Sequence, residues 1–290
     1  MTKQKFSQLA ARGPVLLDGA TGSNLRAAGM PVGVSPELWV LEHPEVLLDL
    51  QRSYVEAGSQ IIMAPTFSAN RLGLTNFGLE GRLGELNAAL VALSKEAAGG
   101  HALVAGDLST LGRPLEPVGD MPYSAAYNTY REQMEALAEA GADLFALETL
   151  MGADEAVAAL DAAADFALPV MVSFSAEADG SLPFGGNVWE TAAMLQEMGA
   201  AAVGVNCSVG PDQLESVIRS VRAAVDIPVI AKPNAGLPVM DEQGQAHYSM
   251  GPEDFARHMA VLVNAGANIT GGCCGTTPAY IRQLAKVLKR

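Results

Sequence analysis

The sequence predicts a (β/α)8 TIM barrel, and the order and spacing of its apolar runs are the reason. Eight short apolar runs alternate with amphipathic stretches along 290 residues, which is the pattern of a parallel sheet whose strands are joined by helices. No linker-like stretch rich in serine, glycine or charge divides the chain, so we expect a single barrel domain over residues 1–290. The alternative is a doubly wound open sheet, which would need fewer residues or a second domain.

Four of the runs share one sequence pattern, in which a helical stretch ends in a glycine and a small residue before the strand begins. The four stretches are EAGSQIIMAPTF (56–67), EAGADLFALET (139–149), EMGAAAVGVNC (197–207) and NAGANITGGCC (264–274). The glycines fit the left-handed position that ends a helix; they are Gly58, Gly141, Gly199 and Gly266. The remaining runs are VLLD (15–18), ALVAGD (102–107), PVMVSF (169–174) and PVIAKP (228–233). Such short runs bounded by turn signals are typical of strands buried on both faces.

Amphipathic stretches between the runs predict the helices. The clearest are 83–98, 130–141, 210–225 and 251–266. The last two begin with Gly-Pro followed by acids, which favours a helix start. Long loops are expected after the third, fifth and seventh strands, at 108–123, 178–188 and 234–250.

Charge and composition exclude several classes of function. The chain has 18 basic and 32 acidic residues, a net charge of −14, which argues against binding to nucleic acid or to anionic membranes. No apolar run approaches the roughly 18 residues of a membrane span, and the N-terminus lacks a signal-peptide core. Three cysteines, an odd number, do not make a disulfide framework. We therefore expect a protein of the cytoplasm with free, catalytic or metal-bound thiols.

Polar or sulfur-bearing side chains follow the predicted strands, at the end where TIM barrels carry their reactive groups. In chain order they are Asp18, Thr66, Asp107, Glu148 with Thr149, Ser173 with Ser175, Asn206 with Cys207, Lys232 with Asn234, and Cys273 with Cys274. All three cysteines of the chain therefore lie at the ends of the sixth and eighth strands. These strands are two apart in a closed barrel, so the thiols are expected within reach of one another across its mouth.

The stretch GGCCGTTP (271–278) places two thiols side by side. Neighbouring side chains of a regular strand face opposite ways, so the sulfurs converge only if Gly271, Gly272 and Gly275 let the backbone leave strand geometry. Three thiolates predict a soft metal, most simply Zn²⁺, with its fourth position open. The alternatives are a phosphate site with Thr276–Pro278 capping the next helix, or cysteines that merely pack.

An open three-thiolate zinc favours binding a fourth thiol, which loses its proton on coordination. Because a thiolate is the nucleophilic form of sulfur, the predicted chemistry is alkyl transfer to sulfur. Asp18 and Glu148, expected to have no basic partner, are candidates for holding the ammonium group of an amino-acid thiol. The alternatives are a turn at Asp18–Gly19 and a backbone-capping role for Glu148. A Schiff-base role for Lys232 is disfavoured by the proline that follows it, and none of the four histidines lies at a strand end.

Six motifs occur in order between about residues 15 and 280, namely LLDGATGSN, APTF, ALET, GVNC, KPNAGLP and GGCCGTTP. Together they resemble the homocysteine S-methyltransferase family, and they are most similar to the homocysteine-binding module of cobalamin-dependent methionine synthase. PNAGLP favours the cobalamin-dependent members over those that use betaine or S-methylmethionine. The resemblance implies a TIM barrel in which Cys207, Cys273 and Cys274 hold zinc and homocysteine sulfur takes the fourth position.

The same resemblance implies that Asp18 and Glu148 bind the ammonium group of homocysteine. We assign Asn206, Asn234 and Thr66 to the substrate site as well. The amide oxygen of Asn234 is a candidate fourth zinc ligand in the absence of substrate, with a turn role before Ala-Gly as its alternative.

The sequence departs from methionine synthase in two places. It runs only to Arg290, directly after the last expected helix, so we expect no folate- or cobalamin-binding module in this chain. The third strand ends in GDLSTLGRP (106–114), where the family more usually shows Gly-Pro. The expected function is zinc-dependent methyl transfer to homocysteine, giving methionine, from a methylcorrinoid carried by a separate protein or from methylcobalamin. The alternatives are a small onium donor (betaine or S-methylmethionine), a corrinoid-linked demethylase component, and a non-catalytic thiol-binding module.

Overall fold

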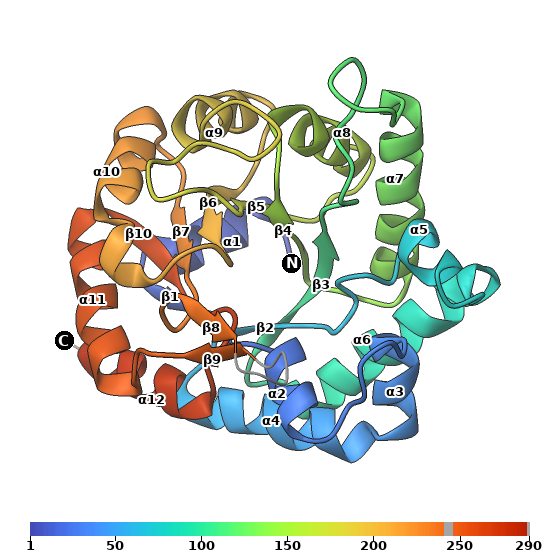
Figure 1. Cartoon of the computed structure of the whole chain (residues 1–290), viewed down its shortest axis with the longest axis horizontal. Coiled ribbons are helices and arrows are strands. Elements are labelled where there is room, and N and C mark those ends of the chain that lie inside the picture. The colour runs from blue at the N-terminus through green and yellow to red at the C-terminus, as the bar shows by residue number, and fades with distance from the viewer. Residues whose placement is uncertain (241–245, 289–290) are drawn as a thin grey trace.

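A computed structural model describes residues 1–240 and 246–288 of the chain. Eight parallel strands form a ring (Figure 1): β1 (Val15–Leu16), β2 (Ile61–Met63), β3 (Leu103–Ser109), β4 (Leu144–Leu150), β5 (Val170–Phe174), β6 (Ala202–Asn206), β7 (Val229–Lys232) and β10 (Ala267–Thr270). A parallel bridge between Leu17 and Ile61 joins the first strand to the second and closes the ring. The predicted TIM barrel is therefore confirmed, and closure excludes the open doubly wound sheet.

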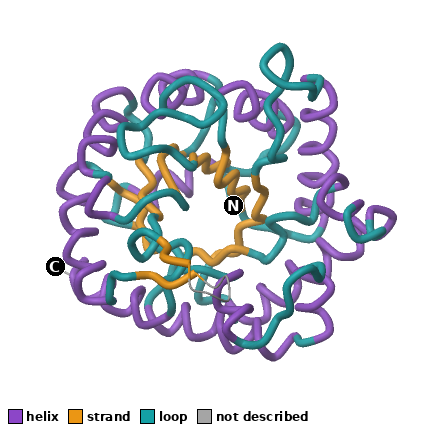
Figure 2. Tube along the Cα trace, viewed as in Figure 1, coloured by secondary structure: helices purple, strands orange, loops and turns teal. Residues whose placement is uncertain are grey.

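Helices surround the ring on all sides (Figure 2). They are α1 (Lys3–Ala10), α2 (Gly22–Ala27), α3 (Pro36–Glu42), α4 (Pro44–Ala57), α5 (Arg71–Thr75), α6 (Leu83–Ala98), α7 (Tyr123–Glu139), α8 (Ala153–Ala163), α9 (Val188–Glu197), α10 (Glu215–Ala224), α11 (Pro252–Ala265) and α12 (Pro278–Leu288), with short 3₁₀ turns at Glu80–Arg82 and Pro211–Gln213. Within the described ranges, no helix is long and apolar enough to cross a bilayer.

The predicted helices are present, but some of them begin or end at other residues than expected. The stretch 83–98 is helical over its whole length, whereas the helix expected at 130–141 already begins at Tyr123. The stretch 210–225 divides into a 3₁₀ turn and α10. All four glycines expected to end helices have positive φ, with values of 113°, 85°, 94° and 121° in chain order.

Two apolar clusters hold the barrel together. The larger lies between the strands and the helices. The smaller fills the barrel interior with alternate strand residues such as Leu17, Met63 and Ile230, and it includes Phe6 of α1, because successive strand residues point to opposite faces. The Lys3 ammonium donates to the Gly199 carbonyl at 3.2 Å, in the turn before β6. Helix α1 thus covers the end of the barrel at which the strands begin, opposite the end at which they finish.

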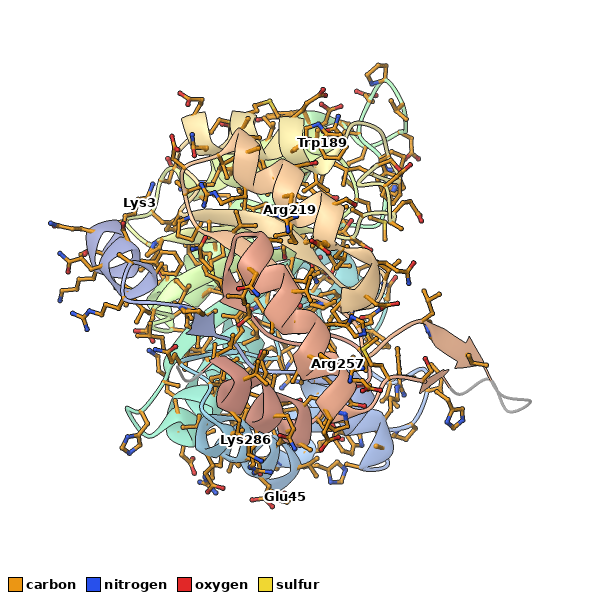
Figure 3. The ribbon with its side chains drawn as sticks, turned by 90° about the vertical axis from the view of Figure 1, so that its left-hand side faces the viewer. Lys3, Glu45, Trp189, Arg219, Arg257 and Lys286 are labelled. Atoms are coloured by element: carbon orange, nitrogen blue, oxygen red, sulfur yellow. The ribbon has the colours of Figure 1, made fainter. Side chains whose placement is uncertain are left out.

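The end at which the strands finish carries the largest corrections to the predicted loops. The loop expected at 234–250 contains an antiparallel hairpin, β8 (Pro238–Met240) with β9 (Ala246–Tyr248), which stands out from the barrel on the side away from α1 (Figure 3). Strand β3 continues to Ser109, which pairs with Glu148 in β4. The carboxylates of Asp107 and Glu148 therefore leave the strands themselves rather than the loops that follow.

Candidate functional site

The three thiols converge as predicted. Their sulfur atoms all lie within 4.8 Å of one another, and the Sγ atoms of Cys207 and Cys274 are 3.6 Å apart. A tetrahedral zinc ion with bonds of about 2.3 Å separates its sulfur ligands by about 3.8 Å. Cys273 is buried and the other two cysteines are half-buried, so one side of the cluster stays open. The donor set and its spacing fit a zinc ion with one free position.

Two unusual backbone turns bring the thiols together. Cys207, directly after β6, has a left-handed φ of 49°, and its carbonyl accepts a hydrogen bond from Ser175 at 3.0 Å. In the cysteine turn, Gly275 has a φ of 80°. Gly271 and Gly272 do not have a positive φ, and they allow close approach instead. A Cβ at Gly271 would lie 2.8 Å from the Asp18 carbonyl oxygen, and a Cβ at Gly272 would lie 2.4 Å from the Thr276 Oγ1 atom.

Hydrogen bonds among the three thiols shift their pKa values in opposite directions. Hydrogen bonds from Cys207 and Cys273 lower the pKa of the Cys274 thiol to about 3. The bond with Cys273 acts to lower the pKa of Cys207, but the bond with Cys274 and burial outweigh it and raise that pKa to about 12. Hydrogen bonds to the other two thiols, with burial, raise the pKa of Cys273. A divalent cation that binds here releases the remaining protons.

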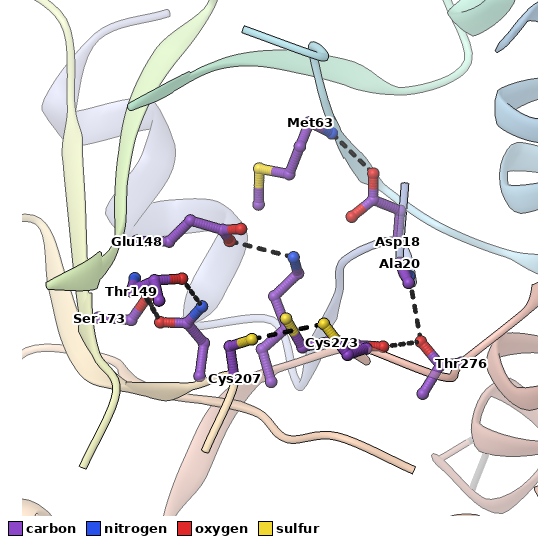
Figure 4. A network of polar contacts seen from close by, with 12 residues as sticks. Asp18, Ala20, Met63, Glu148, Thr149, Ser173, Cys207, Cys273 and Thr276 are labelled. Carbon is purple, nitrogen blue, oxygen red and sulfur yellow. Dashed lines mark hydrogen bonds and ion pairs between the residues drawn. The ribbon is translucent and has the colours of Figure 1, made fainter. Parts of the chain in front are cut away.

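Asn206 fixes the strand end that carries Cys207, which lies near Thr149 and Ser173 in Figure 4. Its side-chain oxygen accepts from the Thr149 amide at 2.7 Å and from the Ser173 hydroxyl at 2.9 Å, and its amide nitrogen donates to the Thr149 hydroxyl at 2.8 Å. These bonds hold Thr149 at a φ of 62°. Asn206 is fully buried and lies outside the pocket wall; its assignment to the substrate site stays a prediction.

The expectation that neither Asp18 nor Glu148 has a basic partner is wrong for Glu148. The Lys232 ammonium donates to its carboxylate at 3.0 Å, and both side chains are buried. Burial acts to lower the pKa of Lys232, but the charges of Glu148, Cys273, Asp18 and Asp107 outweigh it and raise that pKa. Lys232 is therefore a charged partner of the acids, which is incompatible with the neutral amine that Schiff-base chemistry requires.

Asp18 is fully buried and does not line the pocket, whose wall includes the adjacent Gly19. Its assignment to the substrate ammonium stays a prediction. One carboxylate oxygen accepts from the Met63 amide at 2.8 Å, and the other is buried with no hydrogen-bond partner among the described residues. Burial raises the pKa of Asp18 to about 7, although the nearby Lys232 acts to lower it. An unpaired buried carboxylate oxygen is a strong acceptor for an arriving cation.

The side chains of Thr66 and Asn234 differ in whether their polar atoms already have hydrogen-bond partners. The Thr66 hydroxyl donates to the Asp107 carbonyl at 2.9 Å and accepts from its amide at 3.0 Å, so it joins β2 to β3. Asn234 donates to the Ser208 carbonyl at 3.0 Å, whereas its side-chain oxygen is buried and has no partner in the part of the chain that the structure describes. That free oxygen is compatible with a ligand role. The substrate-site assignments of both residues stay predictions.

A cavity of about 230 Å³ connects the thiols to the acids. Its wall includes all three cysteines, Glu148 and Lys232, and also Asp107 and Glu37, to which the sequence assigned no role. Burial and the charge of Glu148 raise the pKa of Asp107; its place at the end of the third predicted strand was an available signal. Glu37, which accepts from the Ser35 hydroxyl at 2.6 Å, lies in the first turn of α3. No site was predicted in this stretch, and only the fold places Glu37 at the pocket wall.

Fold and site together define a TIM barrel with an open three-thiol centre at the carboxyl ends of its strands. The family model described as homocysteine S-methyltransferase matches residues 15–288, and the chain belongs to this family. It is 29% identical to the methionine synthase of Mycobacterium tuberculosis over 287 residues and 28% identical to that of Mycobacterium leprae over 292 residues. These alignments cover 92% and 94% of this chain and 24% of each relative, so the chain spans about a quarter of their length.

Solved structures agree with this assignment. The metallated form of the homocysteine methyltransferase MmuM from Escherichia coli superposes with a TM-score of 0.82 at 26% identity, covering 96% of this chain and 98% of that one. Its oxidized form gives a TM-score of 0.83 at 24% identity and covers 99% of both chains. The carboxyl transferase domain of Rhizobium etli pyruvate carboxylase, at 15% identity and a TM-score of 0.56 over 99% of this chain and 49% of that one, shares the barrel fold alone.

Proposed function

We propose that this chain transfers a methyl group to the sulfur of homocysteine, giving methionine, with zinc as its metal and a methylcorrinoid as donor. The observation that carries the proposal is the convergence of three thiols within 4.8 Å beside a pocket walled by acids. Membership of the homocysteine S-methyltransferase family and the likeness to a metallated relative support it.

Different residues would bind the sulfur and the ammonium group of the substrate. Cys207, Cys273 and Cys274 would hold the zinc ion, which when bound supplies a fourth position where the substrate thiol ionises at neutral pH. No protein base is then needed at the transfer step. The substrate sulfur forms its bond to the methyl carbon as the bond between that carbon and the donor breaks, and the electron pair of the broken bond leaves with the corrinoid cobalt. The thioether product is neutral, so it would bind a zinc ion held by the three cysteines more weakly than the thiolate does.

Buried carboxylates at the barrel centre suit the substrate ammonium. Lys232 is the one basic side chain among the described residues of the pocket wall. The charges of Glu148, Asp18 and Asp107 all act to raise its pKa. The ammonium group of homocysteine adds the positive charge that this set lacks. Its arrival favours the ionised form of Asp18, whose pKa of about 7 then falls. The thiol and amino ends of the substrate are thus fixed by separate groups.

A methylcorrinoid carried by a second protein needs a contact surface around the mouth. Seven large apolar side chains in the segments that follow β1, β2, β3 and β7 are between 37% and 89% exposed, and we call them the apolar rim: Val32, Phe67, Leu72, Phe77, Val118, Leu237 and Val239. Phe67 of this set lines the pocket itself, and apolar side chains exposed at a pocket favour docking of a macromolecule. The rim supports a protein-borne donor over a small one.

A small onium donor is the second candidate, and one observation favours it. Glu37 and Asp107 add carboxylates to the pocket wall beyond the pair assigned to homocysteine, and acids near a sulfonium or ammonium group stabilise its positive charge. Betaine and S-methylmethionine are therefore the competing donors. A demethylase component would instead consume a methylated compound without homocysteine.

The test combines metal content with a donor screen. We expect about one zinc per chain by elemental analysis, and homocysteine-dependent loss of methylcobalamin absorbance with formation of methionine. Cys207→Ala should lose both the metal and the transfer, whereas Ser94→Ala, which removes a buried hydroxyl on α6, should keep both. Methionine formed only from betaine or S-methylmethionine would overturn the corrinoid assignment, and full transfer by metal-free protein would overturn the zinc assignment.

A further inference from the structure

The β8–β9 hairpin returns a tyrosine to the cysteine turn. Tyr248, at the end of β9, pairs with Pro238 across the hairpin. Its ring lies directly on Gly275: a Cβ at that glycine would be 2.3 Å from the ring Cγ atom and 2.4 Å from Cδ2. Its hydroxyl forms a hydrogen bond with the sulfur of Cys274. A cysteine sulfur that is bound to a metal ion carries no proton, so the phenol is the donor when the ion is bound.

The base of the hairpin is fastened to the same turn, so the tyrosine is held in place. The Ala235 amide donates to the Cys274 carbonyl at 3.0 Å, and the Met250 amide donates to the Ala235 carbonyl at 3.1 Å. The Tyr280 hydroxyl of α12 donates to the Met250 carbonyl at 2.7 Å. Both ends of the segment that carries Tyr248 are therefore anchored next to the thiols.

We propose that Tyr248 is a positioning residue of the metal centre, whose hydroxyl orients the Cys274 sulfur and reduces its electron donation to the bound ion. The inference rests on the proposed zinc function and adds a residue to it. Outer hydrogen bonds orient metal ligands and tune the metal. With less electron density supplied by Cys274, a fourth thiol binds and ionises more readily. Val239 of the apolar rim lies in the same hairpin as Tyr248, and Leu237 lies directly before it. The hairpin segment therefore contributes both to the surface proposed for the donor and to the contacts of the thiolate cluster.

Tyr248→Phe tests this role, because it removes the hydroxyl and keeps the ring on Gly275. Tyr280→Phe is the matched control: it removes a phenol that holds the same segment and touches no sulfur. Zinc affinity is measured by competition with a chromophoric chelator, and each protein is also loaded with Co²⁺ for absorbance spectroscopy without homocysteine. Thermal unfolding of the three proteins checks that the fold is kept.

We expect Tyr248→Phe to bind zinc about 10-fold more weakly and to move the sulfur-to-cobalt charge-transfer band to lower energy, because the sulfur lone pair loses its hydrogen-bond donor. Tyr280→Phe should match the wild type in both readouts. Wild-type zinc affinity and an unchanged band in Tyr248→Phe would overturn the inference alone. A wild-type protein that binds neither metal would overturn the zinc centre, and the inference with it.

Discussion

The burial of Asp18 predicts how the free energy of unfolding depends on pH. The carboxyl is fully buried, one oxygen has no hydrogen-bond partner within residues 1–240 and 246–288, and its pKa is raised from the ordinary value of 3.8 to about 7. Asp18→Asn removes the ionisation and leaves the side-chain shape nearly unchanged. The amide oxygen can still accept from the Met63 amide, which Asp18 contacts at 2.8 Å.

The sign and size of the effect come from proton binding. Between about pH 4 and pH 7 the folded protein keeps the Asp18 proton while the unfolded chain releases it, so the free energy of unfolding falls as the pH rises through this window. The gap between 3.8 and about 7 corresponds to about 4 kcal/mol, since one pKa unit equals about 1.4 kcal/mol. The loss is complete above pH 7 and absent below pH 4.

Urea unfolding of metal-free, reduced protein between pH 4 and pH 8.5 measures the effect. The stability of Asp18→Asn relative to the wild type should increase by about 4 kcal/mol across this range. Asp49→Asn, on the exposed face of α4, is the control for loss of a carboxylate. A difference between Asp18→Asn and the wild type that stays constant with pH, or that decreases, would refute the reasoning.

Three further predictions concern the surrounding contacts. Lys232→Met leaves the buried Glu148 carboxylate unpaired and should lower the free energy of unfolding by about 3 kcal/mol; adding Glu148→Gln should recover most of this loss in the same urea assay, and no recovery would contradict the pairing. Gly275→Ala places a Cβ against the Tyr248 ring at a φ of 80°, so thermal unfolding should show a loss of about 2 kcal/mol, with zinc retention reduced in parallel. Asn206→Ala removes three hydrogen bonds at the end of β6 and should cost about 2 kcal/mol with a lower kcat; activity and stability equal to the wild type would show that the site does not depend on it.

Sequence patterns predicted the barrel because its strands are buried on both faces. Each strand then appears as a short apolar run, and Gly58, Gly141, Gly199 and Gly266 mark the preceding helix ends with the positive φ expected of them. The convergence of the thiols followed from the same argument, since parallel strands finish at one end of the barrel. Strand lengths were less predictable: β3 continues to Ser109 because its hydrogen bonds with β4 continue beyond the apolar run.

The sequence by itself determined the class of site, since residue type decides which chemistry is available: three thiols at two strand ends, with acids at others. Tertiary structure decided which side chains contact one another in the site. Lys232 and Glu148 are 84 residues apart in the chain, and only closure of the barrel places their charges 3.0 Å apart in a buried setting. Tyr248 comes to Cys274 because the hairpin folds back over the turn. Electrostatic and hydrogen-bond contacts depend on distance in space, which local sequence patterns do not encode.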